Sequence, residues 1–172
     1  MSAKLIPGQL APMLECDTLA HGRFDLSAEA PAGGTLVVFH HGVACKWDRR
    51  KLKELDDRIG DFAIRGLRLI AISADSREET ARLQEEMQLI RLPLAFGLPV
   101  AELAAEWGIY TGCDPASASG QLRFEPAQIW VTQSGQIGLC TVQSTGNLWP
   151  DVNFLLRALD QTSKALEMEA AG

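Results

Sequence analysis

Several features that would direct a chain to a membrane or to nucleic acid are missing from this sequence. No apolar run approaches the roughly 20 residues that span a bilayer. The first residues, MSAKLIPGQLAP, lack the apolar core of a signal peptide. With a net charge of −6 and a pI of about 5.1, the chain shows no basic face and would repel phosphate. We therefore expect a cytoplasmic protein that binds neither membranes nor nucleic acid.

Metal-site and disulfide signatures are missing as well. The four cysteines lie far apart, and neither a CxxC nor a CxxH spacing occurs. This spacing argues against a zinc site, and a reducing compartment argues against a disulfide framework. We expect no metal and no cofactor. What remains is one reactive cysteine, with or without a partner thiol, among Cys16, Cys45, Cys113 and Cys140.

What the sequence does contain is the patterning of an α/β protein. Its 172 residues, 47% of them hydrophobic, are enough for one domain spanning residues 1–172. Strand and helix patterns alternate in the middle of the chain, which predicts a central sheet with helices on both faces. The predicted strands are residues 13–17, 23–26, 35–39, 67–72 and 92–96, and a hairpin of 127–132 with 136–142. The predicted helices run from about 45 to 64, from a capping box at Ser76 and Glu79, from 99 to 107, and from about Pro150.

Cys45 lies where the apolar strand 35–39 passes into the first long helix. The N–H groups of a first helical turn lack intrahelical partners, and the helix dipole is positive there. A thiolate at that position is stabilised, so we expect a lowered pKa and a reactive thiol. The alternative is a buried, inert cysteine. Basic side chains in the same stretch favour the reactive thiol, namely His40, His41, Lys46, Arg49 and Arg50.

Several segments in order resemble one known family. LIPGQLAP resembles an opening L-x-x-G-x-x-A-P, and VVF followed by Gly42 and Cys45 is similar to V-V-F-Y-R-G-x-W-C. GLRLIAISADS resembles G-V-x-V-x-A-I-S-x-D-S, and PAQIWV before Gly135 resembles P-A-x-F-V-I-D-x-x-G. These are segments of the peroxiredoxin-like (AhpC/TSA, redoxin) family of the thioredoxin fold. The resemblance implies an α/β thioredoxin-like three-layer sandwich, with a central mixed β-sheet flanked by helices and a peroxiredoxin-type N-terminal extension.

The same resemblance implies a chemistry. Cys45 would be the peroxidatic cysteine, which attacks a hydroperoxide and becomes a sulfenic acid. Pro126 would be a cis-proline facing that cysteine, the alternative being a trans proline that starts a strand. The implied partners are a hydroperoxide substrate and a thiol reductant, either a thioredoxin-like protein or glutathione. A homodimer is a further possibility that the family suggests.

The sequence departs from the family pattern near the cysteine. The usual proline and threonine, seven and three residues before the cysteine, are replaced by Val38 and Gly42. Gly42 has no hydroxyl group to bind a peroxide. Arg123 lies near the place of the activating arginine, although not on the motif position. Asp48 stands where the second cysteine of a Cys-x-x-Cys motif would be, and it has no thiol to resolve a disulfide.

Other residues admit two interpretations. Cys113, in the polar loop 112–120, is a candidate resolving cysteine, because loops often carry function. A small thiol such as glutathione is at least as good a candidate. His40 and His41 are either hydrogen-bond donors or positive charges near the thiolate, or ordinary turn residues. We expect Trp47 in the core and the charges of residues 46–61 on a solvated helix face.

The sequence thus supports two functions. The first is a thiol-dependent antioxidant oxidoreductase that reduces hydroperoxides through Cys45. The alternative is a thioredoxin-fold binding or redox-sensing protein with a degenerate peroxidase site, which Gly42 and Asp48 favour.

Overall fold

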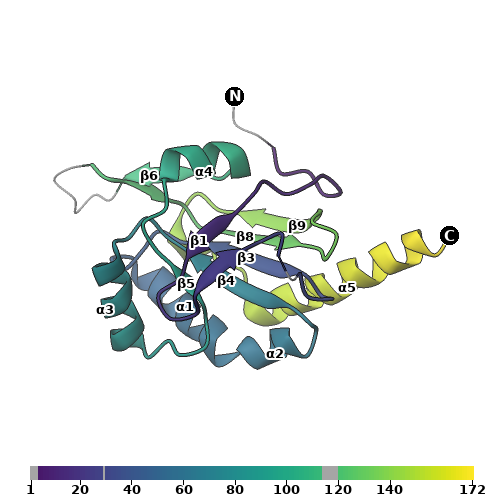
Figure 1. Cartoon of the computed structure of the whole chain (residues 1–172), viewed down its shortest axis with the longest axis horizontal. Helices are drawn as coiled ribbons and strands as arrows, with labels where there is room; N and C mark the ends of the chain where they lie inside the picture. Colours follow the sequence, from purple (N-terminus) through teal and green to yellow (C-terminus); the bar gives the residue numbers. More distant parts are fainter. Residues whose placement is uncertain (1–3, 29, 114–119) are drawn as a thin grey trace.

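A central five-stranded sheet organises the computed structural model, which describes residues 4–28, 30–113 and 120–172 (Figure 1). The strands are β1 (Glu15–Asp17), β2 (Arg23–Asp25), β3 (Thr35–Phe39), β4 (Arg68–Ile72), β5 (Leu94–Ala95), β6 (Thr111–Cys113), β7 (Leu122–Phe124), β8 (Ala127–Val131) and β9 (Ile137–Val142). The helices are α1 (Lys46–Asp57), α2 (Ile59–Ala63), α3 (Arg77–Met87), α4 (Val100–Trp107), the 3-10 helix η1 (Gly146–Leu148) and α5 (Val152–Ala170).

The sheet is mixed, with β3 at its centre. Its strand order is β5-β4-β3-β8-β9. β3 pairs in parallel with β4 and antiparallel with β8, while β9 continues the antiparallel half. Every residue of β3 and of β8 is buried. Both strands are mostly apolar, with Thr35 and Gln128 as their polar residues, because helices cover both faces of the sheet.

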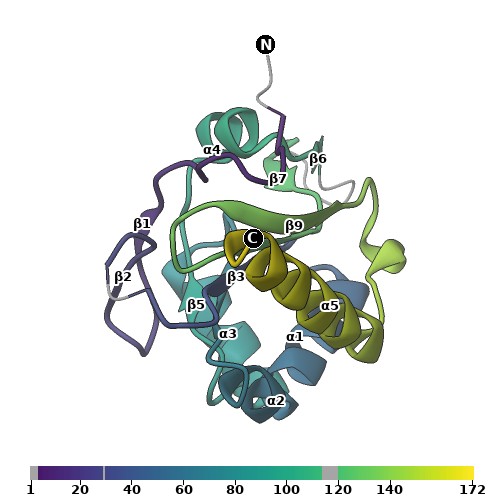
Figure 2. The same cartoon turned by 90° about the vertical axis from the view of Figure 1, so that its right-hand side faces the viewer.

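Successive residues of β3 point to opposite faces and so join different cores. Val37 and Phe39 pack toward α4, the N-terminal strands and β7, where Phe39 stacks at an angle with Trp107 and Phe124. Leu36 and Val38 pack toward the other face, which α1, α2, α3 and α5 cover. Figure 2 shows α4 on one side of the sheet and the other helices on the opposite side. The predicted three-layer thioredoxin-like arrangement is confirmed.

The predicted capping box is also present. The Ser76 hydroxyl accepts from the backbone N–H of Glu79, and the Glu79 carboxylate accepts from the N–H of Ser76. The sequence spacing places Thr80, Leu83, Met87 and Ile90 on one face of this helix, but Ile90 lies beyond its end. α3 ends at Met87 because Gln88 adopts a left-handed conformation, and Ile90 is 76% exposed.

The first long helix differs from its prediction. It is interrupted at Arg58, whose φ of −105° leaves the helical region. The Arg58 guanidinium donates to Asp61, at the start of α2, and to Asn153 of α5. Trp47 is 43% exposed rather than in the core. The charged residues of this stretch do not all face solvent either, because Asp48, Lys51 and Asp56 are buried.

Two short strands were absent from the prediction. Residues 111–113 form β6, which pairs antiparallel with β7, so that Cys113 is opposite Leu122. The sequence had placed Gly112 and Cys113 in a loop; residues 114–119 of that loop lie outside the described residues. Among the described residues, no helix is both long and apolar enough to cross a membrane.

Candidate active site around Cys45

Cys45 is the N-cap residue of α1, as the sequence predicts. Its backbone N–H donates to the carbonyl of Gly42 (3.2 Å), which closes the turn that leads out of β3. The side chain is half-buried. The backbone N–H groups of Trp47 and Asp48, in the first turn, favour the thiolate, although the thiol makes no capping hydrogen bond in this structure. A thiolate here would therefore have two donors at the positive end of the helix dipole.

Nevertheless, burial raises the pKa of the Cys45 thiol above its ordinary value, and the negative charge of Asp48 raises it further. The two N–H groups act in the opposite direction and are outweighed. The expected lowering of the pKa is therefore wrong. The basic side chains do not reverse it, because Arg49 pairs with Glu86 at 2.7 Å and Lys46 lies 5.0 Å from the Trp47 ring. Cys45 rests as a thiol rather than a thiolate.

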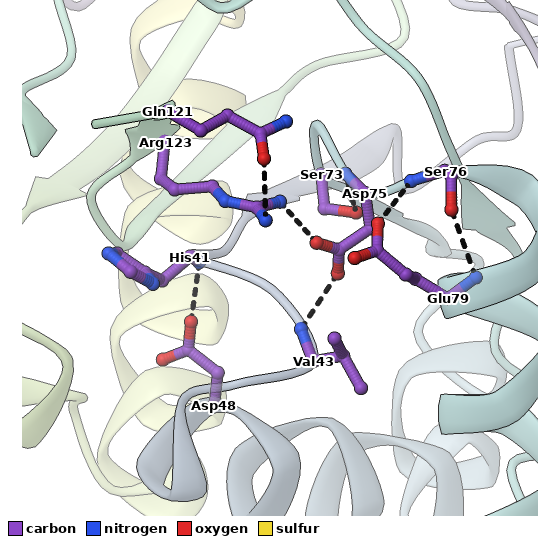
Figure 3. Close-up of polar contacts among 9 residues, drawn as sticks. All are labelled: His41, Val43, Asp48, Ser73, Asp75, Ser76, Glu79, Gln121 and Arg123. Carbon is purple, nitrogen blue, oxygen red and sulfur yellow. Dashed lines mark hydrogen bonds and ion pairs between the residues drawn. The ribbon is translucent and has the colours of Figure 1, made fainter. Parts of the chain in front are cut away.

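Asp48 is the carboxylate closest to this chemistry. It lies on the first turn of α1, fully buried, and all its hydrogen-bond partners are donors. The Trp149 indole donates to Oδ1 at 2.8 Å, and the backbone N–H of His41 donates to Oδ2 (Figure 3). A carbon built as Cβ on Gly146 would be 2.8 Å from Cys45 Sγ and 3.2 Å from Asp48 Oδ1. The sulfur and the carboxylate thus face one another beneath η1.

A second buried carboxylate holds the turn before Cys45 from the other side. Asp75, just beyond β4, accepts the backbone N–H of Val43 at 2.7 Å and forms an ion pair with Arg123 of β7 (Figure 3). Burial raises the pKa of Asp75, while the Val43 N–H and the Arg123 charge oppose that effect. Arg123 also donates to Gln121 at 3.2 Å. Arg123 therefore lies in the region of Cys45, but its guanidinium is bound by Asp75.

Gly42 is required by the shape of this turn. Its φ is +124°, and a Cβ there would lie 2.6 Å from Asp75 Oδ1. A threonine cannot occupy this place without moving the buried Asp75. The missing hydroxyl is therefore a consequence of the Asp75–Arg123 arrangement, which the sequence comparison with the family pattern does not reveal.

The two histidines take different roles. His40 is 2% exposed, its Nδ1 has no partner, and burial lowers its pKa to about 4. It is neutral near pH 7 and adds no positive charge. His41 is half-buried and contributes its backbone N–H to Asp48, while its ring lowers the pKa of Glu125, which burial raises.

Pro126 is not the predicted cis-proline. The described residues contain no cis peptide bond, so the Glu125–Pro126 bond is trans. The chain runs extended from β7 into β8 at this point. Glu125 donates its N–H to Tyr110, and the carbonyl of Pro126 accepts from Gln143. Pro126 is therefore a trans proline at the start of a strand.

The remaining cysteines occupy separate elements, and all four thiols are free. Cys16 of β1 is buried, which raises its pKa to about 11. Burial also raises the pKa of Cys140 in β9. Cys113 is exposed on β6. Among the residues that the structure describes, no cluster of His, Cys, Asp or Glu is arranged to hold a metal ion.

A cavity of about 500 Å³ lies between α1, η1 and the start of α5, beside the cysteine. Gly146, whose Cβ position lies 2.8 Å from Cys45 Sγ, lines this cavity, whereas Cys45 itself does not. Its walls combine two indole rings with charged and amide side chains, from Trp47, Arg50, Lys51, Glu54, Gly146, Asn147, Trp149 and Asp151.

Sequence reasoning missed two residues of this site. Asp48 was read only as a residue that cannot form a disulfide, although its spacing from Cys45 is that of a capping box, N-cap to N3. Asp75 belongs to a recognised motif, but nothing in the sequence shows that it reaches Val43 and Arg123. The contacts of Asp75 with Val43 and with Arg123 both join segments that are far apart in the sequence.

Comparison with known proteins identifies the family and the fold. The sequence matches the AhpC/TSA family over residues 7–137. No curated protein sequence matches the chain.

Solved structures of peroxiredoxins have a similar fold. A cysteine-to-serine mutant of peroxiredoxin 6 from Arenicola marina is 18% identical, with a TM-score of 0.79 over 91% of this chain and 73% of that one. AhpC from Enterococcus faecalis is 16% identical, with a TM-score of 0.75 over 96% of each chain. The yeast mitochondrial 1-Cys peroxiredoxin is 15% identical, with a TM-score of 0.69 over 91% of this chain and 76% of that one. At these identities the likeness establishes the fold.

Proposed function

This chain belongs to the AhpC/TSA family, and from that premise we propose that it is a thiol-dependent peroxidase whose peroxidatic residue is Cys45. The thiolate of Cys45 would attack a hydroperoxide, releasing an alcohol or water and leaving a sulfenic acid.

One observation carries the proposal. Cys45 is the N-cap of α1, where the backbone N–H groups of Trp47 and Asp48 in the first turn favour the thiolate. Those donors stabilise the charged sulfur during attack. The other cysteines offer no comparable arrangement, since Cys16 is buried and Cys140 lies within a strand.

The raised pKa of Cys45 favours a second candidate. In a binding or redox-sensing protein, a thiol that rests protonated would react slowly and be oxidised only by high peroxide. The two candidates differ in the rate of oxidation and in turnover with a reductant.

For the reductant we propose an external thiol. Cys113 is paired in the β6–β7 ladder and is not a free loop residue, which argues against an easy approach to Cys45. The structure of the yeast mitochondrial 1-Cys peroxiredoxin is described as showing thiol resolution through glutathione and thioredoxin systems. Because such thiols abound in reducing compartments, we propose the cytoplasm as the site of action.

Peroxide consumption with glutathione as reductant tests the function. We expect the wild-type protein to turn over hydrogen peroxide or an alkyl hydroperoxide and Cys45→Ser to lose turnover. Cys140→Ser is the matched control, because it removes another half-buried thiol while keeping the site. Mass spectrometry should find the sulfenic acid, trapped with dimedone, on Cys45. Unchanged turnover in Cys45→Ser would end the proposal, and single-turnover oxidation without catalysis would support the sensor.

A further inference from the structure

Asp48 is bound in the way expected of an ionised carboxylate. The Trp149 indole donates to Oδ1 and the backbone N–H of His41 donates to Oδ2, which suits an ionised carboxylate because that form offers acceptors alone. The side chain is fully buried on α1. A buried charge must be compensated, and here donors from two distant parts of the chain compensate it.

The same carboxylate faces the Cys45 thiol. Cβ built on Gly146 would be near both Cys45 Sγ, at 2.8 Å, and Asp48 Oδ1, at 3.2 Å. The negative charge of Asp48 favours the protonated sulfur. A buried carboxylate therefore lies close to the thiol, and the site needs a base because its cysteine rests protonated.

Among the described residues, Asp48 is the group best placed to exchange this proton. The titratable groups that interact electrostatically with Asp48 are Cys45, His40 and Glu125, which lie in the connections after β3 and after β7. His40 lies at the end of β3 with its Nδ1 unpartnered. Arg123, the cation in the region, is bound by Asp75.

We propose that Asp48 is the acid–base residue of the peroxide reaction, taking the proton from Cys45 and giving it to the leaving oxygen. This inference rests on the proposed peroxidase function. The carboxylate accepts the thiol proton, and the thiolate sulfur then forms a bond to the terminal oxygen of the hydroperoxide. The O–O bond breaks, so the sulfur is oxidised to a sulfenic acid and the peroxide is reduced. The departing alkoxide or hydroxide takes the proton from Asp48 and leaves as alcohol or water.

The two effects of Asp48 on Cys45 give opposite predictions, which makes the test sharp. As a charge alone, Asp48 suppresses the thiolate, so removing it would speed every reaction of Cys45. As an acid–base residue, Asp48 is needed to protonate the leaving oxygen, so removing it would slow reaction with peroxide. The rate of alkylation by iodoacetamide depends on the thiolate but not on protonation of a leaving group, because iodide leaves without taking a proton.

The experiment compares both reagents at pH 7 in the wild type and in Asp48→Asn. We expect alkylation of Cys45 to be unchanged or faster in the variant, while sulfenic acid formation with hydrogen peroxide falls by about 100-fold. Asp56→Asn is the matched control: Asp56 is also buried on α1 and accepts two backbone N–H groups, from Arg91 and Leu92. It should leave the ratio of the two rates as in the wild type.

The wild type alone supplies a second measurement, should Asp48→Asn fail to fold. The pair formed by Cys45 and Asp48 reacts with peroxide while it holds one proton. Its peroxide rate should therefore rise and then fall with pH, while the alkylation rate keeps rising.

The outcomes separate the two proposals. Peroxide oxidation in Asp48→Asn that matches or exceeds the wild-type rate, or parallel pH profiles for the two reagents, would overturn the role of Asp48 alone. A wild-type Cys45 that hydrogen peroxide does not oxidise would overturn the proposed function, and this inference with it.

Discussion

At the scale of single residues, the backbone shape of Gly42 explains the chief departure from the family pattern. Its φ of +124° lies where a side chain is strained, and Asp75 fills the space that a side chain would need. The sequence shows that a threonine is missing there. It does not show that the neighbouring carboxylate excludes one, since Asp75 lies 33 residues further along the chain.

We therefore predict that restoring the family residue harms the protein. Gly42→Thr should lower the free energy of unfolding by about 2–5 kcal/mol, from backbone strain and overpacking together, without speeding oxidation of Cys45. Urea denaturation measures the first effect and peroxide kinetics the second. Gly22→Thr is the control: its φ is also positive, at +73°, but nothing lies within 4 Å of its Cβ position. Equal losses in the two variants would contradict the role given to Asp75.

His40 gives the protein a pH-dependent stability. Burial lowers its pKa from 6.5 to about 4, so between these values the unfolded chain binds a proton that the folded chain does not. The free energy of unfolding should therefore rise with pH across this window, by up to about 3 kcal/mol, and level off above it. His40→Phe fills the site without titrating.

Urea denaturation at pH 4.5 and at pH 7 measures this contribution. The difference in unfolding free energy between the two pH values should be smaller in His40→Phe than in the wild type. His21→Phe serves as control because His21 is exposed. If both variants keep the full wild-type pH dependence, His40 is not its source.

At the scale of elements, features that depend on neighbouring residues were predicted correctly, whereas features that depend on distant contacts were not. Ser76 and Glu79 mark the start of α3, and Gly108 marks the end of α4. Helix caps can be predicted from sequence because they involve neighbouring residues. By contrast, the break at Arg58 depends partly on Asn153, and β6 exists only through its pairing with β7. Patterns of neighbouring residues cannot reveal either of these distant partners.

α5 is an element whose two halves have different surroundings. Its buried residues are all in the first half, Val152, Leu155, Leu156 and Leu159, and its end extends beyond the sheet (Figure 1). Leu166 and Met168 near the end are exposed. Deleting residues 165–172 should therefore cost less than about 1 kcal/mol of unfolding free energy, whereas Leu156→Ala should cost about 2–5 kcal/mol.

Urea denaturation of the two variants makes this comparison. The helix should remain cooperative with the rest of the protein in the truncated chain, because the Arg65–Asp160 ion pair and all four buried positions are kept. A truncation as costly as Leu156→Ala would mean that the exposed turns pack against something in solution, with a second copy of the chain as the first candidate to test by sedimentation.

At the scale of the whole molecule, the fold brings the ends of β3 and β4 together with β7 and η1 around one cysteine. The alternation of strands and helices was enough to predict the sheet and its covered faces, since β3 and β4 are apolar after their first residues, Thr35 and Arg68. It was not enough to predict the charges of the site. Asp48 and Asp75 are both buried, and their partners come from three other segments of the chain: the turn after β3, β7, and the connection between η1 and α5.

The positions of the four cysteines in the fold lead to the last prediction, that the sulfenic acid of Cys45 reacts with a thiol from outside the chain. Cys16 is buried, Cys140 belongs to β9, and Cys113 is held opposite Leu122 in the β6–β7 ladder. Forming a bond with any of them would require an element to leave its place, whereas a small thiol from solution needs no strand to move. After one equivalent of hydrogen peroxide and excess glutathione, mass spectrometry should find glutathione on Cys45, and Cys113→Ser should form that adduct at the wild-type rate. A peptide cross-linked through Cys45 and Cys113, lost in Cys113→Ser, would show instead that the β6–β7 ladder opens during the reaction.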